Sequence, residues 1–117
     1  RAEWAMQNAS DMGRIDVSFG GITGVRKALG FYEAIGMQCE LEYVGFANLA
    51  LLGSTSEETC EYYERGLLRP EEDYDSLVPP HLKQPCDPMD ENGFVSIPQG
   101  PGLGFEFDWN YVNANLV

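Results

Sequence analysis

Three acidic residues stand at or near the ends of three segments in which apolar and polar residues alternate. They are Asp16 in "RIDVSF", Glu42 in "MQCELEY" and Glu64 in "TCEYYERGL". Carboxylates that gather in one place repel one another unless a cation or a shared proton lies between them. Glu40 alternates onto the same side as Glu42, so this pair indicates a general base or a metal ligand. A solvated edge is an equally good interpretation of the pair.

The elements that must position these carboxylates can be predicted from the spacing of the apolar residues. A period of two predicts strands, and a period near 3.6 predicts helices. Gly20 and Gly21 predict a tight turn after the first strand, Thr23 is a candidate helix cap, and Gly36 ends that helix. The predicted strands are residues 14–19, 37–43 and 59–67, and the predicted helices are residues 2–9, 24–35 and 47–55.

The order strand, helix, strand, helix, strand is typical of parallel βαβ units. Each predicted strand has one apolar and one polar face, whereas an open parallel sheet covered on both sides has two apolar faces. A barrel of the TIM type, or a part of one, accounts for this pattern because its polar mouth lies at the carboxyl ends of the strands. Residues 1–68 are expected to form this α/β part. Residues 69–117 are rich in proline and acid at first and then in glycine, which predicts irregular structure with two short extended pieces.

Composition limits the partners of the protein. The net charge of −12 arises from 19 acidic and 7 basic residues, so no basic stripe for nucleic acid or for an anionic membrane surface is expected. No apolar run reaches the roughly 18 residues of a membrane helix. The three cysteines, Cys39, Cys60 and Cys86, lack the spacing of a disulfide framework or a zinc site, and they indicate reduced thiols in a cytoplasmic protein.

Four stretches together resemble the C-terminal portion of the mandelate racemase/muconate lactonizing enzyme family, within the enolase superfamily. They are "IDVSFGGITG", "GMQCELEYVG", "EYYERGLL" and "PQGPGLGFEFD". The resemblance runs over nearly the whole chain. It implies the last three strands of a (β/α) barrel with their helices, followed by a tail that returns to a capping domain.

The resemblance also implies an activity. Members of this family use Mg²⁺ to help remove a proton alpha to a carboxylate, so the substrate is expected to be a small carboxylate. An acid-sugar dehydratase (a lyase) or a racemase, epimerase or cycloisomerase (an isomerase) is the expected enzyme. The magnesium ligands and the lysine base are expected on strands that this sequence does not contain, so no metal ligand is assigned here.

Site residues follow from the resemblance position by position. Asp16 matches the aspartate that pairs with a catalytic histidine, and Glu64, with Glu61 as its rival, matches a glutamate that hydrogen-bonds a substrate carboxylate. Glu42 stands where the histidine is expected, and an Asp–Glu pair would instead share a proton. Ser18 and Glu40 are assigned to substrate binding.

Two other functions stay open at this point: a divergent member of the family without catalysis, and a small acidic α/β binding domain. The opening "RAEWAMQNAS" reads as the end of a helix, so the chain is expected to be a fragment that is inactive by itself. Three strands with open edges are also expected to associate, which predicts a homo-oligomer.

Overall fold

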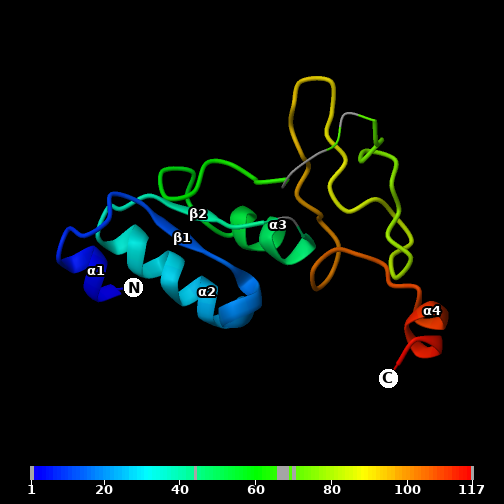
Figure 1. Ribbon diagram of the computed structural model, residues 1–117, viewed down its shortest axis with the longest axis horizontal. Coiled ribbons are helices and arrows are strands. Elements are labelled where there is room, and N and C mark those ends of the chain that lie inside the picture. The colour runs from blue at the N-terminus through cyan, green and yellow to red at the C-terminus, as the bar shows by residue number, and fades with distance from the viewer. Residues whose placement is uncertain (1, 44, 66–68, 70, 117) are drawn as a thin grey trace. The chain divides into compact units, whose positions relative to one another are not determined.

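The computed structural model describes residues 2–43, 45–65, 69 and 71–116, and it divides into two compact units, residues 1–66 and 67–117. Most of the regular structure lies in the first unit (Figure 1). Its elements are α1 (Ala2–Met6), β1 (Gly13–Ile15), α2 (Val17–Ala34), β2 (Cys39–Leu41) and α3 (Phe46–Gly53), and the second unit has α4 (Trp109–Ala114). No helix in the described part of the chain is both long and apolar enough to cross a membrane.

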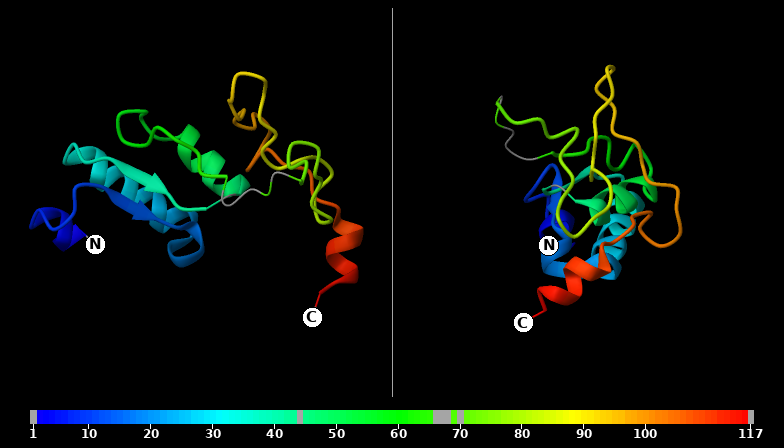
Figure 2. Two further views of the ribbon diagram at one scale, coloured as in Figure 1. Left: turned by 45° about the horizontal axis from the view of Figure 1, so that its top comes forward. Right: turned by 90° about the vertical axis from the view of Figure 1, so that its right-hand side faces the viewer.

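The sheet of the first unit consists of two parallel strands, β1 and β2, joined through α2. Arg14 pairs with Glu40, and Ile15 pairs with Leu41. Ile15 and Leu41 are buried, whereas Arg14 is exposed, so the sheet has one apolar and one charged face. Helix α2 runs along these two strands, and the two further views show the same arrangement (Figure 2).

The core of the first unit forms between the apolar face of the sheet and α2. Helix α2 contributes Val25, Leu29 and Tyr32, which follow one another at helical spacing and are all buried. Helix α3, predicted from "ANLALLGST", is confirmed, and its Leu51 joins the same core. Gly36 has a φ of 66° directly after the helix cap, which fits the predicted end of α2.

The first strand is shorter than predicted. The chain leaves the strand at Asp16, because the Asp16 side chain accepts a hydrogen bond from the Ser18 backbone N–H and caps a helical turn that begins at Val17. The prediction that residues 14–19 are all strand is therefore wrong, and Phe19 is 85% exposed instead of buried. Helix α2 also starts before Thr23, so Thr23 is not its cap. Its path bends at Gly21, where φ is 61° and ψ is 173°, a conformation that only glycine adopts readily.

The third predicted strand, residues 59–67, is reduced to one parallel bridge between Tyr63 and Leu41. Residues 66 and 67 lie outside the described residues. The segment before the bridge turns tightly, because the Thr59 and Cys60 N–H groups both donate to the carbonyl oxygen of Ser56. The Cys39 N–H donates to the Thr59 carbonyl at 2.7 Å, which holds this segment beside β2.

The second unit is mostly irregular, as its proline and acid content predicts. Two isolated antiparallel bridges occur in it, Leu82 with Phe107 and Met89 with Val95. The sequence predicts only irregular structure with two short extended pieces here, but the last segment forms helix α4. The reason is again a cap: the Asp108 side chain accepts hydrogen bonds from two backbone N–H groups of the first turn.

Candidate functional site

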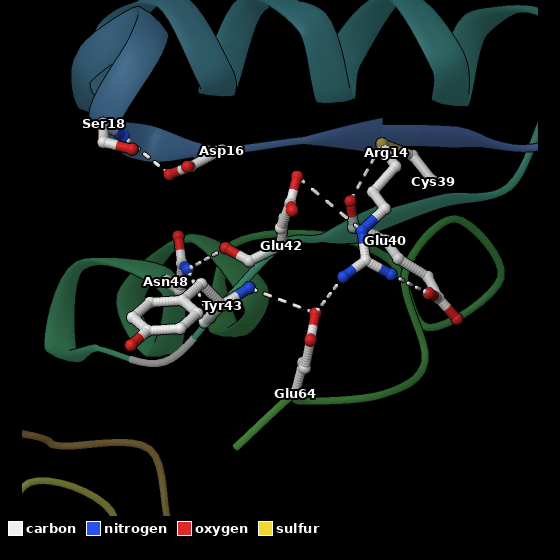
Figure 3. Close-up of polar contacts among 9 residues, drawn as sticks. All are labelled: Arg14, Asp16, Ser18, Cys39, Glu40, Glu42, Tyr43, Asn48 and Glu64. Atoms are coloured by element: carbon white, nitrogen blue, oxygen red, sulfur yellow. Dashed lines mark hydrogen bonds and ion pairs between the residues drawn. The ribbon is translucent and has the colours of Figure 1, made fainter. Parts of the chain in front are cut away.

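The charged face of the sheet carries one arginine surrounded by three glutamates. Nη2 of Arg14 lies 2.6 Å from Oε2 of Glu64, its Nε lies 3.7 Å from Oε2 of Glu42, and its Nη1 lies 3.8 Å from Oε2 of Glu40 (Figure 3). We call Arg14, Glu40, Glu42 and Glu64 the Arg14 cluster. These side chains are between 38% and 49% exposed, so the cluster is open to small molecules from solvent.

The cluster follows directly from strand alternation. Arg14 and Glu40 are register partners on adjacent parallel strands, so their side chains leave the same face of the sheet. Glu42 lies two residues beyond Glu40, and Glu64 follows the bridge that Tyr63 makes with Leu41. Three segments that are distant in sequence thus contribute to one charged patch.

The loop after β2 is fixed by side chains from three directions. The buried amide of Asn48 donates from Nδ2 to the carbonyl oxygens of Glu42, at 2.9 Å, and Tyr43, at 2.7 Å. The Tyr43 N–H donates to Oε2 of Glu64 at 3.1 Å, and the Gly45 N–H donates to the Tyr63 hydroxyl at 2.8 Å. Tyr43 has a φ of 74°, an unfavourable value for a residue with a side chain. These hydrogen bonds hold Glu42 at the start of a constrained loop.

Asp16 lies at the end of β1, next to the cluster, and its carboxylate is turned toward Ser18 (Figure 3). Its Oδ1 accepts the Ser18 N–H at 2.8 Å. Asp16 also lines a pocket of about 260 Å³ together with Phe19 and Gly24. The structure thus joins Glu40, Glu42 and Glu64 in one cluster and joins Asp16 to Ser18 beside it. The rival residue Glu61 lines a smaller pocket of about 90 Å³ near Cys39.

The described residues do not fit a magnesium site. Among them, no group of three histidine, cysteine, aspartate or glutamate side chains is arranged to hold a metal ion. The guanidinium of Arg14 already lies against all three glutamates, in the place that a cation would take.

Sequence reasoning missed two residues of the site, Arg14 and Asn48. The signal for Arg14 was present, because it alternates with Asp16 on the same strand and so shares its face. The signal for Asn48 was a single amide inside the apolar stretch "ANLALLG". A polar residue in such a stretch is buried with its helix and must find hydrogen-bond partners there.

The chain belongs to the family described as enolase C-terminal domain-like, which it matches over residues 1–111. The predicted membership in the enolase superfamily is thereby confirmed.

A solved structure gives a more particular likeness. The chain is 42% identical to D-glucarate dehydratase from Agrobacterium tumefaciens, crystallised as a complex with magnesium, with a TM-score of 0.87. The match covers 100% of this chain but 30% of that enzyme. A comparison with curated proteins found no match. The predicted α/β fold, that of the C-terminal part of an enolase-superfamily enzyme, is confirmed at this level.

Proposed function

We propose that these 117 residues are part of an acid-sugar dehydratase that removes a proton alpha to a carboxylate. The observation that carries the proposal is the 42% identity, over the whole chain, to a D-glucarate dehydratase. In this proposal β1, β2 and the segment around Tyr63 belong to a (β/α) barrel. Residues 69–117 are the tail that returns to a capping domain.

The reaction needs a base, a leaving group and stabilisation of negative charge. The base takes the alpha proton while the carbon–oxygen bond of the beta hydroxyl breaks, and the departing hydroxide takes a proton from solvent and leaves as water. The resulting enol then gains a proton at the beta carbon, loses its hydroxyl proton to solvent and becomes a 2-keto acid. We assign the proton transfer at the alpha carbon to the carboxylate of Glu42, with Asp16 beside it at the end of β1.

The other predicted residues take supporting roles. Ser18 and Glu40 are proposed to hydrogen-bond hydroxyl groups of the substrate, because an acid sugar offers several donors and acceptors. Glu64 already accepts two hydrogen bonds at Oε2. Any contact of Glu64 with the substrate would therefore use its other oxygen.

Magnesium belongs to the proposal because the similar enzyme was crystallised with it. When bound, the ion would stabilise the negative charge that develops on the substrate carboxylate. Since the described residues do not fit such a site, its ligands are proposed to lie outside this chain.

One observation favours a different class of function. All three glutamates of the Arg14 cluster lie within 4 Å of the guanidinium, as in a structural ion-pair network, and this suits a divergent member without catalysis. An isomerase, a cytoplasmic location and a homo-oligomeric state also stay predictions.

The test is an assay of the full-length protein that contains this chain. The protein would be incubated with D-glucarate and a panel of other acid sugars, with Mg²⁺ or with a chelator, and 2-keto acid would be measured. Magnesium-dependent 2-keto acid supports the dehydratase. Exchange of the alpha proton without dehydration would favour the isomerase, and binding of Mg²⁺ and acid sugars without either reaction would favour the non-catalytic member.

A further inference from the structure

We infer that Arg14 is a positioning residue that holds Glu42, and the loop that follows it, in the geometry needed for proton transfer. The inference rests on the proposed function, since it takes Glu42 as the group that exchanges the proton. Arg14 acts on Glu42 by two routes.

The first route is direct. Nε of Arg14 lies 3.7 Å from Oε2 of Glu42, which makes an ion pair longer than a hydrogen bond. The shorter bond of the same guanidinium, 2.6 Å to Glu64, fixes where its plane lies. The planar guanidinium of arginine can face three carboxylates at once, each with a different nitrogen. The ammonium group of a lysine is a point charge and cannot do so.

The second route passes through Glu64 to the backbone. Oε2 of Glu64 accepts hydrogen bonds from both Nη2 of Arg14 and the N–H of Tyr43, the residue after Glu42. Tyr43 has a φ of 74°, and such a conformation persists only when its surroundings hold it. Loss of Arg14 would release Glu64 toward water, weaken the bond to the Tyr43 N–H and let the loop relax.

The charge balance among the described residues disfavours a simpler role for Arg14 as a ligand of the substrate carboxylate. Three glutamates lie within 4 Å of one guanidinium, so the cluster has an excess of negative charge. An anionic group approaching Arg14 would have to displace a glutamate from it. Arg14 therefore acts through groups of the protein.

The experiment uses the full-length protein with Arg14→Ala and Arg14→Lys. We expect Arg14→Ala to lower kcat by about 10 to 100 fold with KM changed by less than about threefold, because misplacing a catalytic group by about 1 Å has effects of that size. Guanidinium ion added to Arg14→Ala should restore part of the lost kcat. Arg14→Lys should not restore it, since lysine lacks the fork.

A second measurement does not depend on activity. Hydrogen exchange of the Tyr43 amide should become about tenfold faster or more in Arg14→Ala, while the amide of Leu29 in α2 serves as the unchanged reference. If Arg14→Ala does not fold, Glu64→Gln tests the second route alone, because it keeps the volume and weakens both bonds at Oε2.

The outcomes separate this inference from the proposed function. Faster Tyr43 exchange in Arg14→Ala, combined with a wild-type protein that shows no dehydratase activity, would support the role of Arg14 in holding the loop and contradict the dehydratase. A wild-type kcat in Arg14→Ala, or a large rise in KM with an unchanged kcat, would overturn the inference while the dehydratase stands. Unchanged Tyr43 exchange in both Arg14→Ala and Glu64→Gln would overturn the second route.

Discussion

The side-chain amide of Asn48 holds the backbone of Glu42 from within the core. One nitrogen, Nδ2, donates to the carbonyl oxygens of Glu42 and of Tyr43, and Asn48 is fully buried. Its Oδ1 is buried without a hydrogen-bond partner in the described part of the chain. A half-satisfied buried amide indicates that the two bonds it does make outweigh the one it lacks.

Replacing Asn48 should therefore destabilise the protein strongly. We expect Asn48→Ala to lower the free energy of unfolding by about 1–3 kcal/mol, because it removes the two hydrogen bonds that the buried amide donates to the carbonyl groups of Glu42 and Tyr43. Asn48→Asp should do at least as much harm, because it places a carboxylate against two carbonyl oxygens. Denaturant unfolding measures both variants. Asn113→Ala, at an exposed position of α4, is the control and should change stability by less than about 0.5 kcal/mol. A loss below that size for Asn48→Ala would contradict the role of this amide.

Gly21 and Gly24 offer a matched pair of substitutions, since a Cβ at either meets no atom within 4 Å. Gly21 has a φ of 61° and a ψ of 173°, so Gly21→Ala should destabilise the protein by about 1–3 kcal/mol through backbone strain alone. Gly24 lies inside α2 without a positive φ, so Gly24→Ala should stabilise it by about 0.5–1 kcal/mol. Thermal unfolding of the two variants gives the comparison. Equal changes in stability for Gly21→Ala and Gly24→Ala would show that the fold does not require the bend at Gly21.

Asp16 has a structural role that can be separated from its proposed catalytic one. Asp16→Ala should lower the free energy of unfolding by about 1 kcal/mol, because it removes the side-chain cap of α2. Asp16→Asn keeps a capping oxygen, so its free energy of unfolding should lie within a few tenths of about 1 kcal/mol of the wild-type value. Both variants should lose dehydratase activity, since both remove the charge. Full activity in Asp16→Asn would leave Asp16 with the capping role alone.

The thiol of Cys60 should be protected in the folded protein. Burial raises the pKa of the Cys60 thiol, and Glu40 adds to this effect. Alkylation at neutral pH should therefore modify the partly exposed Cys86 first and Cys60 only on unfolding. The pKa of the Cys60 thiol is higher in the folded than in the unfolded protein, so the protonated thiol contributes to the stability of the fold. This contribution is complete below the ordinary thiol pKa of about 8.5, and it is lost as the pH rises through the pKa of the folded state. Cys60→Ala should remove this part of the alkaline decline in stability. A Cys60 that reacts as fast as Cys86 would contradict the burial.

The sequence was sufficient for the family, the βαβ order, α3 and the end of α2 at Gly36. Each of these depends on local periodicity or on a backbone conformation that one residue type favours. The end of β1 and the start of α4 were not predicted, because single side-chain caps decide them. Asp16 ends β1 early, and Asp108 starts α4 in a stretch that reads as extended.

The candidate site was predicted in part for a similar reason. Glu42 and Glu64 were predicted as acidic residues at strand ends, and Glu40 as the residue on the same face as Glu42. The structure does gather these three. The group that gathers them, Arg14, was overlooked because only carboxylates were followed along the strands. The hydrogen bonds of Asn48 depend on how α3 lies against the loop after β2, and no spacing rule gives that contact.

The central claim is that Glu42 exchanges the alpha proton of an acid sugar, and its most direct test is made in D₂O. The loss of the alpha-proton NMR signal of D-glucarate would be followed in the presence of Mg²⁺ and the full-length protein. Three forms of the protein would be compared: wild type, Glu42→Gln and the control Glu33→Gln. Glu33 is exposed on α2. We predict that Glu42→Gln slows this loss by about 10² to 10⁴ fold, the usual contribution of a general base. Glu33→Gln should match the wild type. A wild-type rate in Glu42→Gln would contradict the account.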